Sequence, residues 1–117
     1  VADGFDVILF ASQAKRVMKP IQIRFDPRGR LWVVGSAVYP QIKPGEFPND
    51  KVLILDDRNR DGRIAADEVT VFADGLMIPT GLEVTGDSRG CYLGEGPNLW
   101  LLRDTDGDDC ADQKEIV

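Results

Sequence analysis

Residues 57–68 (DRNRDGRIAADE) carry oxygen donors at a spacing that suits a metal ion. Calcium takes six to eight oxygen ligands, and side-chain oxygens on alternate residues converge when a loop curls around the ion. Gly62, at position 6 of the twelve, supplies the sharp turn that such a loop needs. The pattern therefore predicts a calcium-binding loop. Its predicted ligands are the side chains at positions 1, 3, 5 and 12 and the carbonyl at position 7, namely Asp57, Asn59, Asp61, Glu68 and Arg63.

The flanking residues indicate what kind of calcium loop this is. An EF-hand has a helix on each side of its loop, whereas residues 52–55 (VLIL) and 69–72 (VTVF) are apolar and largely β-branched. We therefore expect the loop to lie in a β-hairpin, with a structural role rather than that of a helix-opening sensor. The alternative is an acidic solvated turn without an ion, which repulsion between its neighbouring acids disfavours.

A second acidic segment, residues 104–115, follows a similar plan. It has oxygens at positions 1, 3, 5 and 9, but Asp109 stands at position 6, where a glycine is wanted. Aspartate tolerates the left-handed backbone conformation better than most residues, although with some strain. Calcium binding and an ion-free turn are both open interpretations. The candidate ligands are Asp104, Asp106, Asp108, Cys110 at position 7, and Asp112.

Composition excludes several other kinds of chemistry. The 117 residues include no histidine, which rules out a histidine triad, a histidine zinc site and an imidazole base among them. The two cysteines form no C-x-x-C pair, so neither zinc nor covalent haem has a motif here. A net charge of −6 argues against nucleic acid as a partner. No apolar run approaches the roughly 20 residues of a membrane span.

The apolar residues that must position these loops recur at strand spacing almost throughout, which predicts an all-β fold. Turn residues separate the runs at 26–29 (DPRG) and 86–90 (GDSRG), and 35–50 reads as a long loop. Only residues 11–18 have a pattern compatible with one short helical turn. We predict strands at 5–10, 21–25, 31–34, 52–55, 69–72, 81–84, 91–93 and 99–102.

The order of these elements repeats. Gly35 matches Gly94, and each is followed by an apolar strand that leads into an acidic loop. Four short strands every 40–50 residues, roughly, are typical of a β-propeller blade. We therefore predict two consecutive four-stranded antiparallel meanders, with an unrelated β-sandwich or meander as the alternative. The predicted units are an N-terminal segment with a propeller-closing strand (1–18), a first blade (19–78) and a second blade (79–117).

Short stretches spread over nearly the whole chain carry a family resemblance. They are GFDV (4–7), KPIQ (19–22), GRLWVVGS (29–36), YPQIKPG (39–45), NDKV (49–52), VFADGL (71–76), IPTG (78–81) and DTDGD (104–108). In this order they resemble the membrane-bound dehydrogenase-type propellers of planctomycete and verrucomicrobial bacteria, which are related to soluble quinoprotein sugar dehydrogenases.

The resemblance implies a six-bladed propeller in a periplasmic or secreted protein. It further implies calcium, with pyrroloquinoline quinone or a c-type haem in parts of the parent chain outside these residues. The rest of the propeller, or other copies, would be the protein partners. The family's first loop is usually two residues shorter, which leaves open whether Ala65 or Asp67 lies nearer the ion. No catalytic residue is carried over, because no histidine-bearing catalytic loop lies within the chain.

Two functions from different classes follow. The first is the N-terminal part of an exported, calcium-stabilised propeller oxidoreductase that acts on sugars or alcohols. The second is a non-catalytic calcium-binding module for protein or polysaccharide. In a meander both acidic loops share one end, and the resemblance implies that the cofactor and substrate face is the opposite end, at 36–50 and 73–80. Tyr39, Gln41 and Lys43 are the candidate contacts there, with simple loop packing as the alternative.

Cys91 and Cys110 raise a separate question. Both map to the same end of the second predicted unit, on neighbouring strands about 4.8 Å apart. We therefore expect them to lie close enough for a disulfide, which an oxidising compartment would favour. Strand side chains alternate between faces, however, so two free thiols on opposite faces are the alternative.

Overall fold

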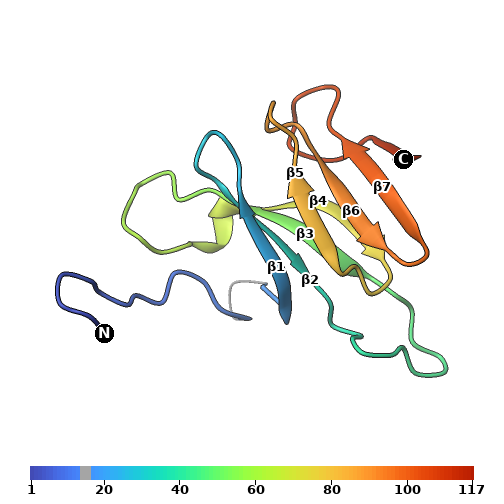
Figure 1. Ribbon diagram of the computed structural model, residues 1–117, viewed down its shortest axis with the longest axis horizontal. Coiled ribbons are helices and arrows are strands. Elements are labelled where there is room, and N and C mark those ends of the chain that lie inside the picture. The colour runs from blue at the N-terminus through green and yellow to red at the C-terminus, as the bar shows by residue number, and fades with distance from the viewer. Residues whose placement is uncertain (14–16) are drawn as a thin grey trace.

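The protein folds into two four-stranded antiparallel sheets, as the computed structural model shows for residues 1–13 and 17–117 (Figure 1). Strands that are adjacent in sequence are adjacent in each sheet, so both sheets are simple meanders. The prediction of an all-β chain with two such units is confirmed. The first sheet contains β1 (Pro20–Phe25), β2 (Leu31–Gly35), β3 (Asp50–Leu55) and β4 (Val69–Leu76). The second contains β5 (Gly81–Val84), β6 (Gly90–Glu95), β7 (Asn98–Arg103) and β8 (Gln113–Ile116).

The central strands of the first sheet are apolar on both faces. In β2, Trp32 and Val34 belong to the core between the two sheets, whereas Leu31 and Val33 belong to a core on the outer face. Alternation of side chains along a strand explains this division. Strands that are buried on both faces have continuous apolar sequences, which is why 31–34 and 52–55 contain no polar residue.

The larger core lies between the two sheets. The first sheet contributes Trp32 and Phe72 among other side chains. The ring centroids of these two residues are 4.6 Å apart, and the rings are tilted by 58°. The second sheet contributes Leu82, Leu93 and Leu102, all almost fully buried. Burying a leucine side chain stabilises a fold by about 1.5–3 kcal/mol, so the contact between the sheets is a major part of the stability.

A smaller core lies on the outer face of the first sheet. Leu31, Val33 and Leu55 pack there with Ile64 of the first acidic loop. The N-terminal segment crosses this face, and the Ile64 N–H donates to the Phe10 carbonyl over 2.9 Å. The N-terminal segment therefore holds the first loop against the sheet.

The predicted strand at 5–10 is not a strand in this structure. Val7 is 80% exposed and Leu9 is 74% exposed, and the segment joins neither sheet. The apolar run has strand propensity, but it pairs with no strand of either sheet and so forms no ladder of main-chain hydrogen bonds. The predicted turn at 11–18 falls partly on residues 14–16, outside the described residues.

Replacing Leu93 by alanine tests the contact between the sheets. Leu93 is fully buried in the shared core, and such a truncation costs about 2–5 kcal/mol of unfolding free energy. Leu99→Ala is the matched control, because Leu99 is 47% exposed on the neighbouring strand. We expect the control to cost less than about 1 kcal/mol. Urea unfolding measures both changes, and equal losses would mean that the sheets are not docked in solution.

Candidate metal-binding loops

Both acidic loops connect the third and fourth strands of their sheet. Residues 57–68 lie between β3 and β4, with the short 3-10 helix η2 (Ala66–Glu68) at their end. The expectation that strands rather than helices flank this loop is confirmed. The second loop was predicted over 104–115, but it ends at Asp112, because Gln113–Ile116 pairs with β7 as β8.

In the first loop, side-chain oxygens accept main-chain hydrogen bonds from residues further along. The Asp57 carboxylate accepts the N–H groups of Asp61 (3.1 Å) and Gly62 (2.9 Å). Asn59 Oδ1 accepts the Asp61 N–H (3.1 Å), and the Asp61 carboxylate accepts the Arg63 N–H (2.8 Å). These bonds curl the chain at positions 1, 3 and 5, but the carboxylates of Asp57, Asp61 and Glu68 do not come together as a three-membered group among the described residues.

The second loop repeats this pattern. The Asp104 carboxylate accepts the N–H groups of Gly107 and Asp109, the latter over 3.0 Å. Asp106 accepts the Asp108 N–H (3.3 Å), and Asp108 accepts the Cys110 N–H (2.8 Å). In both loops, position 1 therefore binds the amide of position 6, position 3 that of position 5, and position 5 that of position 7.

The glycine is at position 6 in the first loop and at position 4 in the second, yet both loops have left-handed residues at the same two positions. Positions 4 and 6 are left-handed in each: φ is 57° at Arg60 and 78° at Gly62, and 89° at Gly107 and 64° at Asp109. Each loop thus has one glycine and one non-glycine residue at these two positions. Asp109 does not disrupt the loop, because Gly107 takes the other left-handed position and aspartate tolerates this conformation.

A carboxylate closes each loop at its far end. Glu68 is buried and accepts the N–H groups of Arg58 and Ala65, both over 3.0 Å. Asp112 accepts the Thr105 N–H over 3.0 Å and the Thr105 hydroxyl over 2.6 Å. In both loops the amide of position 2 binds this carboxylate, so Asp112 at position 9 takes the place of Glu68 at position 12.

Asp67 and Ala65 were the two alternatives for the position nearest a metal ion. The Asp67 side chain is 82% exposed, and its carboxylate lies 3.4 Å from Nη2 of Arg58. Ala65 contributes its N–H to Glu68 instead. Glu68 is therefore the acidic side chain that lies within the loop, while Asp67 lies on its outside.

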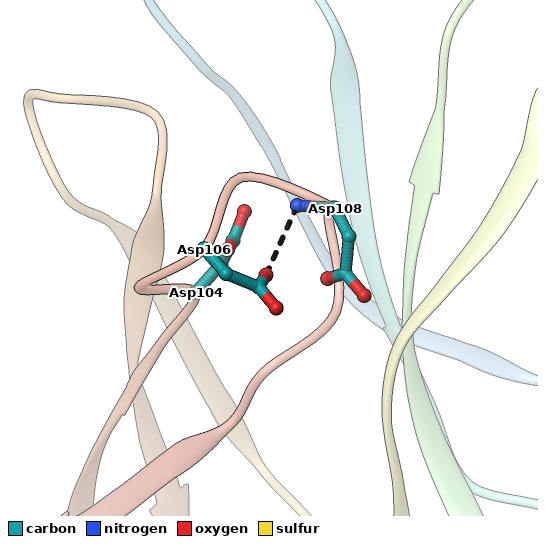
Figure 2. Close-up of side chains that lie close together, drawn as sticks. All are labelled: Asp104, Asp106 and Asp108. Atoms are coloured by element: carbon teal, nitrogen blue, oxygen red, sulfur yellow. Dashed lines mark hydrogen bonds between the residues drawn. The ribbon is translucent and has the colours of Figure 1, made fainter.

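Three carboxylates converge in the second loop (Figure 2). One oxygen from each of Asp104, Asp106 and Asp108 lies within 4.8 Å of the others. Calcium binds oxygen at 2.3–2.6 Å, so two ligands on opposite sides of an ion are at most about 5 Å apart. The spacing of the three oxygens is thus of the size that an oxygen-bound cation needs. In the first loop, the Asn59 amide donates to Asp61 Oδ2 over 3.1 Å and offers only its oxygen as a ligand.

The carboxylates of the second loop repel one another most strongly at Asp106. The Asp108 N–H lowers the pKa of Asp106, but repulsion from Asp108, burial, and repulsion from Asp112 and Asp104 together raise it above its usual value. Burial raises the pKa of Asp104, but hydrogen bonds from the Gly107 and Asp109 amides and the nearby Arg89 lower it overall. Arg89 Nη2 lies 3.9 Å from Asp104 Oδ1 and only partly offsets the negative charge.

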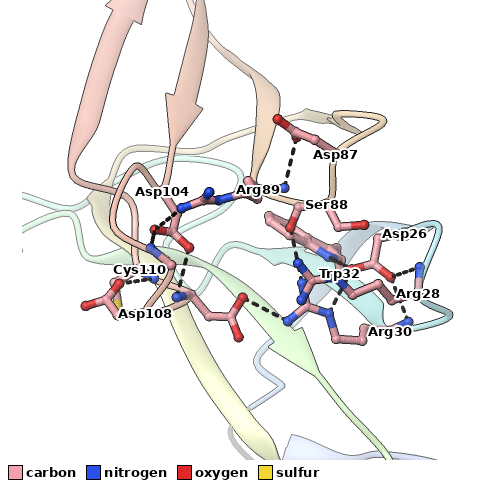
Figure 3. Close-up of polar contacts among 12 residues, drawn as sticks. Asp26, Arg28, Arg30, Trp32, Asp87, Ser88, Arg89, Asp104, Asp108 and Cys110 are labelled. Atoms are coloured by element: carbon pink, nitrogen blue, oxygen red, sulfur yellow. Dashed lines mark hydrogen bonds and ion pairs between the residues drawn. The ribbon is translucent and has the colours of Figure 1, made fainter.

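A buried ion-pair network lies between the second loop and the first sheet (Figure 3). Arg30 Nε lies 2.8 Å from Asp26 Oδ2, and Nη1 lies 2.8 Å from Asp109 Oδ1. Nη2 donates to the Ser88 carbonyl over 3.2 Å, while Asp26 also accepts Nε1–H of Trp32 over 3.1 Å. Sequence reasoning missed this network. It took 26–29 as a simple turn, although an acid and an arginine four residues apart bracket that turn.

Comparison with models of protein families identifies the family to which the chain belongs. Residues 1–117 match the model of a family described as a domain of unknown function, DUF7133. The chain belongs to this family. Comparisons with curated proteins and with solved structures gave no match. The DUF7133 match spans both sheets and both loops, and it leaves the function to be argued from the geometry.

The opposite end of the sheets in this DUF7133 chain is organised by Asp50. This buried carboxylate accepts the Ser36 hydroxyl (2.6 Å) and the N–H groups of Ala37 (2.7 Å) and Ile78 (2.9 Å). It thereby ties the loop after β2 to the connection between the sheets. The three candidate ligand contacts at this end, Tyr39, Gln41 and Lys43, are exposed. No helix within the described residues is long and apolar enough to cross a membrane.

The predicted disulfide is wrong, because both cysteines are free. Cys91 pairs with Leu102 across β6 and β7, and its side chain is buried in the core between the sheets. Cys110 is exposed in the second loop, where Sγ lies 3.5 Å from the Val71 carbonyl of β4. The two side chains thus point to different surroundings, as the alternation of strand side chains allows.

The two thiols should differ sharply in reactivity. Burial raises the pKa of Cys91 to about 12, and Cys91 is inaccessible, so a water-soluble disulfide reagent should modify only Cys110 in the native protein. In urea, without any reductant, both thiols should react. Counting modified thiols by absorbance checks this, and fewer than two reactive thiols in urea would contradict the free state of the pair.

The ion-pair network should make stability depend on pH. Burial raises the pKa of Asp26, but bonds from Trp32 and Arg30 outweigh it and lower this pKa below 3.8. The ionised carboxylate therefore stabilises the fold above about pH 4, and this contribution is lost as the pH falls below that value. Asp26→Asn should lower the unfolding free energy by about 3 kcal/mol at pH 7. The difference from the unmodified protein should shrink below pH 4 in urea titrations; a difference that is constant from pH 7 to pH 3 would contradict the assignment.

Proposed function

We propose that this chain is a calcium-stabilised β-propeller segment whose two acidic loops each bind a calcium ion. The observation that carries the proposal is the shared geometry of the loops, which arises from different sequences. Positions 1, 3 and 5 have side-chain oxygens in both loops, and these oxygens accept main-chain hydrogen bonds in the same pattern. When bound, calcium would neutralise the converging carboxylates and cross-link the turns of the loop.

The candidate ligands in the second loop are the carboxylates of Asp104, Asp106 and Asp108. In the first loop they are the Asp57 and Asp61 carboxylates and the Asn59 oxygen. Glu68 and Asp112 already accept amide hydrogen bonds, and a carboxylate has enough lone pairs to bind an ion in addition. All of these donors are hard oxygens, which favours calcium over softer metals.

In this proposal the two sheets are consecutive blades of a propeller. A repeated main-chain contact supports it: the position 8 amides of the two loops, Ile64 and Ala111, donate to the carbonyls of Phe10 (2.9 Å) and Phe72 (2.7 Å). These two acceptors lie in similar sequences, VILFA at 7–11 and VTVFA at 69–73. The N-terminal segment thus contacts the loop of the first sheet in the same way as β4 contacts the loop of the second sheet. A strand of a preceding blade would make this contact.

For the parent protein, the resemblance supports an exported oxidoreductase that acts on sugars or alcohols. Its pyrroloquinoline quinone or c-type haem would lie in parts outside the present chain, and this segment would supply a rigid scaffold. The alternative is a non-catalytic module that binds protein or polysaccharide. Asp50, the buried acid at the end opposite the loops, holds the surrounding loops together, which suits a scaffold role in either function.

Calcium titration tests the proposal directly. Chelator-stripped protein should release or take up heat on calcium addition, with two sites, and millimolar calcium should raise the melting temperature. Asp61→Ala should remove the first site, and Asp108→Ala should remove the second. Arg63→Ala is the matched control, because only the main-chain carbonyl of that residue is a candidate ligand. Magnesium, which binds such flexible oxygen cages poorly, should raise the melting temperature much less. A melting temperature unaffected by calcium would reject the structural role.

A further inference from the structure

The second acidic loop is attached to the first sheet by the residues that follow its candidate ligands. Asp109, at position 6, pairs with Arg30 over 2.8 Å. Cys110, at position 7, lies with Sγ 3.5 Å from the Val71 carbonyl, and Ala111, at position 8, donates its N–H to the Phe72 carbonyl over 2.7 Å. The loop belongs to the second sheet, yet three consecutive residues of it contact the first.

Arg30 makes this attachment sensitive to the position of the loop. Its side chain is 6% exposed, and its guanidinium donates to Asp26, Asp109 and the Ser88 carbonyl. Asp26 lies in the first sheet's own turn, whereas Asp109 and Ser88 come from the second sheet. The Asp109 side chain is 38% exposed, so water partly screens its pair with Arg30, and this pair opposes separation of the sheets by a modest amount.

Asp109 connects the ion pair to the candidate ligands. Its carboxylate binds Arg30, while its own N–H donates to Asp104 Oδ2 over 3.0 Å. It directly follows Asp108, whose carboxylate is one of the three that converge. The backbone of Asp109 is left-handed, with φ at 64°, and its amide and its carboxylate are positioned by these two contacts. A change in the curl of the loop therefore displaces the partner of Arg30.

We propose that calcium binding at the second loop and docking of the two sheets are coupled through Asp109 and Arg30, so that each strengthens the other. The coupling rests on the calcium-binding function proposed above. By linkage, an ion that fixes the loop in the docked geometry raises the stability of docking, and docking raises the calcium affinity by the same factor. The calcium ion in the second loop then stabilises the contact between the sheets as well as the hairpin of β7 and β8.

Two arginine variants separate this coupling from simple electrostatics. Removing a positive charge near a calcium site should tighten calcium binding if charge alone matters. Arg89→Gln removes a positive charge 3.9 Å from Asp104 Oδ1 and keeps both side chains of the Arg30–Asp109 ion pair. Arg30→Met also removes a positive charge, but it breaks the contact with Asp109. The coupling therefore predicts calcium binding that is weaker by roughly 5- to 10-fold in Arg30→Met and unchanged or tighter in Arg89→Gln.

A pair of neutral variants tests the same coupling without any change of charge. Leu93→Ala weakens the core between the sheets, whereas Leu99→Ala, on an exposed position of the adjacent strand, does not. The coupling predicts weaker calcium binding in Leu93→Ala and unchanged binding in Leu99→Ala. This pair decides the question if Arg30→Met does not fold. Glu83→Gln is a further control, since it removes an exposed ion pair between the sheets, 2.8 Å from Arg24, that does not contact the loop.

Isothermal titration with calcium chloride measures all of these affinities, in an Asp61→Ala background that leaves only the second loop. If the background protein and Arg89→Gln bind calcium while Arg30→Met and Leu93→Ala bind it more weakly, the coupling holds. Tighter binding in Arg30→Met, or equal affinities in Leu93→Ala and Leu99→Ala, would overturn the coupling and leave the calcium site intact. An unmodified chain that binds no calcium would reject the proposed function itself, and the coupling with it.

Discussion

The guanidinium of Arg30 is the interaction on which the arrangement of the two sheets depends most. It lies beneath the turns and loops at one end of both sheets, and its three partners come from three different connections. An apolar contact between sheets is tolerant of small sliding motions, because burial is not directional. Hydrogen bonds to a planar guanidinium are directional, so they fix the register of one sheet on the other. The apolar core thus supplies most of the free energy, and Arg30 supplies much of the geometry.

The two acidic loops show how a backbone conformation can survive a change of sequence. The hydrogen bonds from positions 5, 6 and 7 to the side chains at positions 3, 1 and 5 recur in both, and so do the left-handed residues at positions 4 and 6. What the sequence varies is which of the two left-handed positions has the glycine. At the other position of the second loop, Asp109 both adopts the strained conformation and binds Arg30, so its cost in strain is offset by an ion pair. The substitution that looked like a defect in the pattern is therefore the residue that connects the loop to the neighbouring sheet.

Local patterns in the sequence were sufficient for the strands from 20 to 103 and for the hairpin nature of the first loop, because alternation and turn residues act over a few positions. They also identified the acidic residues that converge, since Asx-type hydrogen bonds are local too. They were insufficient for contacts between distant segments. Arg30 and Asp109 are 79 residues apart, and nothing at either position marks the other as its partner. The choice between a disulfide and two free thiols at Cys91 and Cys110 could not be made from sequence for a related reason: spacing gives the neighbourhood of two residues, but the face that each one occupies depends on register. The end of the second loop was placed three residues too late because the polar residues of Gln113–Ile116 lack the apolar alternation of an inner strand.

The segments VILFA and VTVFA show that the same local signal leads to different outcomes. Residues 69–73 form part of β4 because β3 lies beside them and completes the ladder of main-chain hydrogen bonds. Residues 7–11 have equal or greater strand propensity, yet they belong to neither sheet and leave Val7 and Leu9 largely exposed. A segment with strand propensity forms a strand only when another strand lies beside it, since an isolated strand gains neither a hydrogen-bonded ladder nor a packed face. Phe10 nevertheless accepts the Ile64 amide as Phe72 accepts that of Ala111, so the contact on one edge of this segment is already the contact of an outer strand. The segment pairs with no neighbouring strand, and its apolar side chains therefore stay largely exposed.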